Sequence, residues 1–197
     1  MTRWFVVAAM LAACAGPIDP GEQVDAGAEP PVDAAVATPG EMSIARAEEW
    51  VAVQVHYCQA PNHTRDADAA CSSTCTRYDN PAWDLYRSDC SGFVSWAWDL
   101  AAPGRITSQF APFKSDLTHT IIATDLRPGD AVNNMDHMML FKEWITQPTK
   151  AAFIEEPGCS SATPYAHEFT ATVMTAGMMV AIVGHGTFTA IRYDEAP

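Results

Sequence analysis

The stretch over residues 15–40 most constrains what this chain can fold into. Acidic residues alternate there with Pro, Gly and Ala, and the stretch has no Lys, Arg or aromatic residue. Such a composition cannot bury enough apolar surface to offset the entropy of ordering the chain. We therefore expect residues 14–40 to be a disordered linker and a single folded domain to span residues 41–197.

The first 13 residues are typical of an export signal. Arg3 precedes an apolar run from Phe5 to Ala13, far shorter than the ~20 residues that a membrane-spanning helix needs. The run ends in Leu11-Ala12-Ala13-Cys14, which resembles a bacterial lipobox. The resemblance implies cleavage before Cys14 and a lipid on its thiol, which would anchor the chain to a membrane of the bacterial cell envelope. The alternative is an ordinary signal peptide with an incidental cysteine, which also predicts export.

The charge balance argues against a nucleic-acid partner. The chain has 24 acidic and 11 basic residues, a net charge of −13. A nucleic-acid-binding protein needs a basic face to neutralise phosphates. Hydrophobic residues make up 48% of the sequence, enough for a real core. We expect a monomer with no cofactor.

Hydrophobic periodicity changes along the domain. A helix capped by Ser43 and a second, buried helix starting at Cys90 are expected first. After Arg127-Pro128-Gly129 the period becomes that of strands. Helices followed by strands predict an α+β domain. The expected strands are residues 138–145, 151–154, 180–183 and 188–193.

The six cysteines divide by expected role. Cys14 is assigned to the lipid and Cys90 to chemistry. Outside the cytoplasm the remaining four predict two disulfides; they are Cys58, Cys71, Cys75 and Cys159. We favour Cys71–Cys75 with Cys58–Cys159, although the sequence cannot choose the pairing. The alternative is a zinc site, whose spacing matches no standard finger; its ligands would be His56, Cys58, His63, Cys71 and Cys75.

Cys90 is the candidate nucleophile. It follows Asp89, a good N-cap residue, at the expected start of a buried helix. A helix N-terminus stabilises a nearby anion, which favours a thiolate. The small Ser91 and Gly92 leave room for a substrate carbonyl near the first-turn amides. The alternative is a buried structural cysteine.

His137 is the candidate base. It stands at the head of the apolar segment 138–145. A cysteine nucleophile needs a base that takes its proton and later protonates the leaving amine. Of the six histidines only His137 opens a clear strand. Three others lie in polar, loop-like contexts and are expected to face solvent: His119, His167 and His185.

Two segments resemble the NlpC-type cell-wall peptidases of the papain-like superfamily. They are Asp89-Cys90-Ser91-Gly92-Phe93-Val94, and Leu126-x-Pro128-Gly129-Asp130 with His137. The resemblance spans about residues 44–193. It implies a papain-like α+β fold, in which a central helix starting at the catalytic cysteine packs on an antiparallel, barrel-like sheet. It also implies bacterial cell-wall stem peptides as substrates.

The same resemblance implies a third polar residue on the strand after His137, which orients the imidazole. The matching position is Glu155, with Glu156 as the fallback and a solvated pair as the alternative. The family often has a tyrosine that helps at the oxyanion; Tyr57 matches by context and Tyr78 only by distance. The Gly-Gly that usually follows this tyrosine is missing.

The sequence therefore predicts a cysteine hydrolase that cleaves amide bonds, with Cys90 as nucleophile and His137 as general base and acid. Tyr57 and Ser91 are the expected oxyanion or substrate-binding residues, and Trp83 and Tyr86 are candidates for a groove wall. Two alternatives stay open: an amidase or acyltransferase acting on another substrate, and a non-catalytic wall-binding lipoprotein.

Overall fold

The structure, a computed structural model, describes residues 36–59 and 80–194. All of them belong to one unit, residues 36–197. The expected signal, the lipobox with Cys14 and most of the expected linker lie outside the described residues. So do His63, Cys71, Cys75 and Tyr78.

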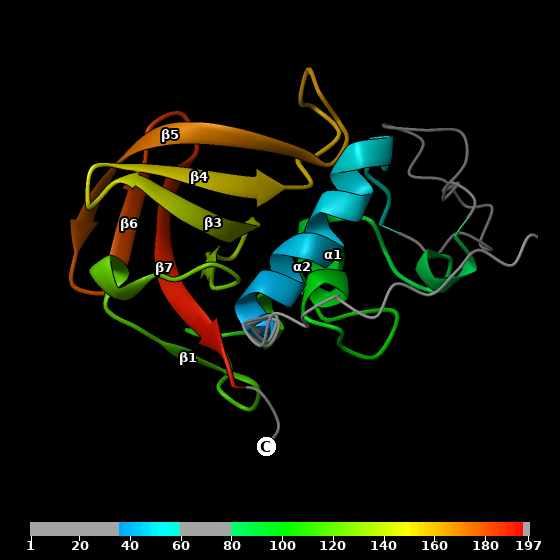
Figure 1. The fold of residues 1–197 in the computed structure, drawn as a ribbon, viewed down its shortest axis with the longest axis horizontal. Helices are drawn as coiled ribbons and strands as arrows, with labels where there is room; N and C mark the ends of the chain where they lie inside the picture. The colour runs from blue at the N-terminus through cyan, green and yellow to red at the C-terminus, as the bar shows by residue number, and fades with distance from the viewer. Residues whose placement is uncertain (1–35, 60–79, 195–197) are drawn as a thin grey trace, which may run out of the picture. The chain divides into compact units, whose positions relative to one another are not determined.

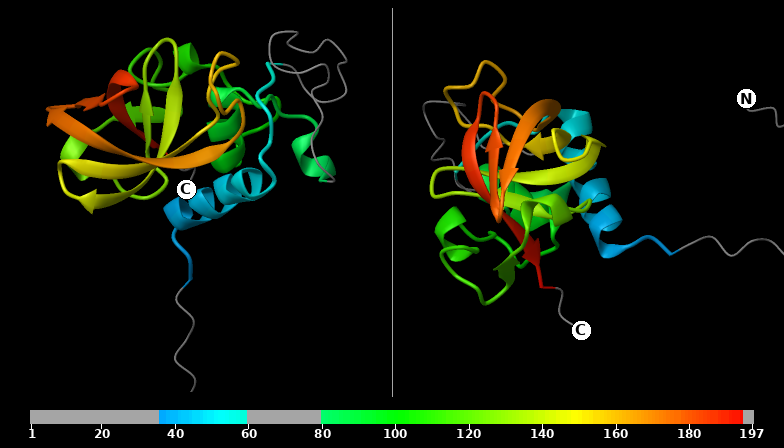
Figure 2. Two further views of the ribbon diagram at one scale, coloured as in Figure 1. Left: turned by 90° about the horizontal axis from the view of Figure 1, so that it is seen from above. Right: turned by 90° about the vertical axis from the view of Figure 1, so that its left-hand side faces the viewer.

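An antiparallel sheet dominates the described residues (Figure 1). Its strands follow the order β7-β2-β3-β4-β5-β6, and β6 pairs back with β7, so six strands close into a barrel (Figure 2). The short strand β1 pairs with β7 outside this closure. The strands are β1 Thr118–Thr120, β2 Ala131–Asn133, β3 Met138–Thr146, β4 Lys150–Glu155, β5 His167–Ala176, β6 Met179–Ile182 and β7 Gly186–Tyr193.

The first four residues of β3 and the last five of β4 are buried on both faces of the sheet, which explains the apolar run Met138–Phe141 and the apolar run Ala151–Ile154. Met139, Phe141 and Phe153 belong to one core cluster, together with residues of β5, β6 and β7. Leu140 and Ile154 point the other way and belong to a second cluster with the helices. The alternation of side chains along a strand produces this division.

Two α-helices lie beside the barrel in the described residues, α1 Pro39–Val53 and α2 Cys90–Ala97 (Figure 1). Helix α1 begins before the expected Ser43 cap, because Thr38 and Glu41 form a capping box with each other. The helices pack together through Trp50, whose ring lies 5.8 Å from that of Phe93. In the described part of the chain, no helix combines the length and apolarity needed to cross a membrane.

The expected papain-like α+β fold is wrong. The described residues form mostly a closed antiparallel barrel, with helices of only 15 and 8 residues. Helix α2 ends early because the chain turns at Asp99, whose φ is +57°. Residues 167–176, which were not among the expected strands, form the ten-residue strand β5. Both differences shift the balance from helix to sheet.

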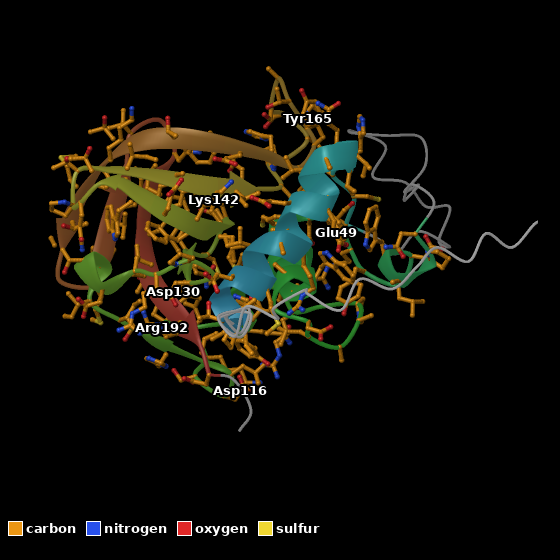
Figure 3. All side chains as sticks on the ribbon, in the orientation of Figure 1. Glu49, Asp116, Asp130, Lys142, Tyr165 and Arg192 are labelled. Carbon is orange, nitrogen blue, oxygen red and sulfur yellow. The ribbon has the colours of Figure 1, made fainter. Side chains whose placement is uncertain are left out.

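The Pro-Gly-Asp segment before β2 has a structural role. The buried Asp130 carboxylate accepts hydrogen bonds from Arg192 at 2.7 and 2.8 Å, which ties the segment to β7 (Figure 3). Gly129 has a φ of +87°, and a Cβ built there would lie 2.5 Å from the Cα of Gly40. These residues line a cavity of about 710 Å³ that does not include Cys90 or His137.

We expect Gly129→Ala to lower the free energy of unfolding by about 3 kcal/mol, because the backbone conformation and the contact with α1 both oppose a side chain. Gly177→Ala is the matched control, since Gly177 has a φ of +58° but a Cβ there would meet no atom within 4 Å. It should cost only about 1–2 kcal/mol, the penalty of the backbone conformation alone. Chemical denaturation of both variants checks this. Equal losses would contradict the crowding at Gly129.

Candidate active site

Cys90 is the first residue of α2, directly after its N-cap. The Asp89 carboxylate accepts a hydrogen bond from the Gly92 N–H at 2.7 Å. The N–H groups of Cys90 and Ser91 lie in the first turn, where a helix supplies no acceptor of its own. Gly92 packs against the backbone, since a Cβ there would lie 2.2 Å from the Arg87 carbonyl oxygen. Gly92 is therefore required for close packing, and this contact limits the room expected for substrate.

A hairpin brings His137 and Glu155 together. His137 immediately precedes β3 and Glu155 ends β4, and these two strands pair antiparallel. Their ends therefore meet, and His137 Nε2 lies 2.6 Å from Glu155 Oε2. The Glu155 residue is 3% exposed. The side chain of Cys90 lines the same cavity as the His137 ring and lies close enough to raise the pKa of His137. Because Nε2 faces Glu155, we assign the Cys90 contact to Nδ1.

The surroundings of His137 favour its charged form. Burial, the largest influence, lowers the pKa of His137, but hydrogen bonds and charge from Cys90 and Glu155 together outweigh it. The net result raises the pKa of His137 from 6.5 to about 9. The ring is therefore an imidazolium at neutral pH, between the sulfur of Cys90 and the carboxylate of Glu155.

Cys90, His137 and Glu155 all line a cavity of about 410 Å³. Tyr57 joins them because its neighbours in sequence are fixed on two sides: His56 pairs with Tyr165, and Cys58 pairs with Ser88. The Tyr57 hydroxyl accepts a hydrogen bond from Gln59 Nε2 at 2.9 Å. The arrangement combines a nucleophile, a charged proton donor and a hydroxyl around one space.

Two other expected residues lie away from the cavity lining. The Ser91 side chain is buried, and its hydroxyl donates to Asp89 Oδ1 at 3.3 Å, so only its backbone N–H remains a candidate. Glu156 is fully buried and does not line the cavity. The expectation of a groove wall from Trp83 and Tyr86 is wrong, because both belong to the core cluster with the helices.

Sequence reasoning missed two histidines near this site. His167 begins β5 and its Nε2 lies 3.5 Å from Glu155 Oε1; His185 Nδ1 lies 3.9 Å from Glu155 Oε2. Their assignment to solvent-facing loops is wrong, since each ring is only partly exposed and contacts the buried carboxylate. The sequence signal for His185 is Gly184-His185-Gly186, with φ values of +89° and +108° at the glycines. These glycines permit the tight turn that places His185 at the cavity.

The described cysteines differ in state. Cys90 is a free thiol, whereas Cys58 and Cys159 are disulfide-bonded. The pairing stays a prediction, because Cys71 and Cys75 lie outside the described residues. Within residues 36–59 and 80–194, no group of three or more His, Cys, Asp or Glu side chains is arranged to hold a metal ion. Most ligands of the alternative zinc site lie outside those ranges.

Comparison of the chain with protein-family models, with curated proteins and with solved structures finds no match. The site must therefore be interpreted from its own geometry.

Proposed function

We propose that this protein is a cysteine hydrolase that cleaves amide bonds. The observation that carries the proposal is the hydrogen-bonded pair His137–Glu155 beside Cys90, since all three residues line one cavity. A nucleophile, a base in contact with it and a third group that orients the base are the components that covalent acyl transfer requires.

In the proposed reaction the Cys90 thiolate attacks the substrate carbonyl carbon, and the carbonyl π electrons move to its oxygen. The first-turn N–H groups of Cys90 and Ser91, with the Tyr57 hydroxyl, are the proposed donors to this oxyanion. The oxyanion then re-forms the carbonyl, the C–N bond breaks, and the leaving amine takes a proton from His137. Water next attacks the thioester while neutral His137 accepts its proton, and the thiolate leaves.

We propose bacterial cell-wall stem peptides as the substrate. Support comes from the resemblance of Asp89–Val94 to the NlpC-type motif and from the lipobox-like segment at Cys14. This part of the proposal rests on motif residues alone.

Mass spectrometry of purified cell-wall fragments incubated with the protein tests both the reaction and the substrate. We expect new fragments that differ by one hydrolysed amide bond. The Cys90→Ala variant is the control and should produce none. Unchanged fragments with wild-type protein would contradict the cell-wall substrate. The absence of any hydrolysis or acyl transfer across a wider panel of amides would contradict the enzyme itself.

We also propose that a lipid on Cys14 anchors the protein at the cell envelope. Cys14→Ser should then shift at least about 90% of the protein from the membrane fraction to the soluble fraction, because one missing acyl anchor removes most of the membrane affinity. Folding should be unaffected, since the folded unit begins at residue 36. Fractionation with intact-mass analysis checks this. Wild-type protein with no mass added at Cys14 would show that the lipoprotein assignment is wrong.

A further inference from the structure

The Glu155 carboxylate is contacted on both oxygens. Oε2 lies 2.6 Å from His137 Nε2, and Oε1 lies 3.5 Å from His167 Nε2. Glu155 and His167 are direct partners across the β4–β5 ladder. The sheet therefore places His167 on the side of the carboxylate away from the catalytic imidazole.

The second ring nitrogen of His167 fixes the orientation of the ring. Nδ1 is 3.0 Å from the carbonyl oxygen of Tyr165. A carbonyl oxygen only accepts hydrogen bonds, so Nδ1 is the donor in this contact. The ring therefore turns Nε2 toward Glu155, where it lies 3.5 Å from Oε1, within ion-pair distance.

The position of His167 is fixed by its neighbours rather than by the substrate. It begins β5, its ring lies against Tyr165 and Phe169 with centroids at 6.3 and 6.1 Å, and it does not line the Cys90 cavity. Phe169 in turn stacks on His185 at 4.3 Å. His167 can therefore act on the reaction only through Glu155.

We propose that His167 is a positioning residue, which holds Glu155 in the orientation that pairs with His137. This extends the catalytic chain to Cys90–His137–Glu155–His167. The inference rests on the proposed function, which supplies the reaction that Glu155 serves. A carboxylate held on one oxygen only can rotate away from its partner, whereas one held on both is fixed.

The titratable groups that face this pair come from several elements. Glu155 is on β4, His137 precedes β3, His185 is in the β6–β7 turn, and Tyr165 precedes β5. His56, after α1, contacts the ring of Tyr165. Among these described neighbours Glu155 is the carboxylate, and it contacts both His137 and His167.

The test combines kinetics with ¹⁵N NMR of the histidine rings in the full protein. We expect His167→Phe, which keeps a ring but removes the donor, to lower kcat by about tenfold with KM changed less than about twofold. His167→Gln, whose amide can still donate to Oε1, should retain kcat within about threefold of wild type. Glu168→Gln is the control, because Glu168 is the next residue on β5 and pairs with Lys142 instead.

The NMR readout is independent of substrate. The ¹⁵N signals of the His137 ring should change in His167→Phe, because Glu155 can then turn away from His137 Nε2, and should stay as in wild type in Glu168→Gln. His137 signals that His167→Phe leaves unchanged would overturn the proposal. So would a folded His167→Phe variant with wild-type kcat, or a His167→Gln variant no more active than His167→Phe. If no substrate is ever cleaved, the proposed function fails, while the NMR signals still show whether the His167–Glu155 pair forms.

Discussion

Cys90→Ala and His137→Ala should each reduce turnover of the proposed amide substrate by at least about 10⁴-fold. Cys90→Ala removes the sulfur that forms the covalent bond. His137→Ala removes both the cation beside the thiolate and the proton for the leaving amine. The double variant should be at most about threefold slower than either single variant, because the effects of residues that act as one unit are not additive.

The control for these variants is His119→Ala. His119 pairs with Asp194 and lines the other, larger cavity, so the variant should keep wild-type turnover. Initial rates and thermal unfolding should be measured together, to separate loss of chemistry from loss of fold. A folded Cys90→Ala protein with more than about a tenth of wild-type activity would place the nucleophile elsewhere.

Glu155 should show a graded loss. We expect about a hundredfold lower kcat for Glu155→Gln and about a thousandfold for Glu155→Ala. The glutamine amide oxygen can still accept the hydrogen bond from His137 Nε2 but cannot stabilise its charge, whereas alanine leaves Nε2 without this acceptor.

The pH dependence follows from the same contact. His137 must be protonated to give the leaving amine its proton. Wild-type kcat/KM should therefore fall as pH rises through about 9, the pKa of His137. Glu155 is one of the causes that raise this pKa. Glu155→Gln should therefore move the alkaline limb to lower pH. Glu156→Gln is the control and should leave the limb in place. An alkaline limb that moves in Glu156→Gln but stays in place in Glu155→Gln would make Glu156 the third catalytic residue.

The sequence predicted the local geometry of the candidate site better than the fold around it. His137 and Glu155 belong to one hairpin. The resemblance to the NlpC-type motifs implied Glu155 as the partner of His137, and alternation along the strand separated it from Glu156. Asp89 likewise caps α2 at the expected residue, because capping depends on a few neighbouring side chains. These relations are short-range and have sequence signatures.

The fold class depended on features without such signatures. Strand β5 carries small and polar residues on its outer face and only Phe169, Ala171 and Val173 on the other, so its alternation is weak. Barrel closure between β6 and β7 is a long-range pairing that no local pattern encodes. Neither strand β5 nor the β6–β7 pairing was predicted, which led to the incorrect α+β expectation. The same omissions also hid His167 and His185, which approach Glu155 only once β5 and the β6–β7 turn are in place.

The central claim is that His137 is a cation held between Cys90 and Glu155. An NMR titration of the His137 ring in wild-type protein and in Cys90→Ala tests it most directly. We predict that His137 in the wild type titrates near pH 9, and that Cys90→Ala lowers its pKa because the largest cause that raises it is removed. A wild-type His137 that titrates near 6.5, unchanged by Cys90→Ala, would contradict the pairing and the hydrolase proposal that rests on it.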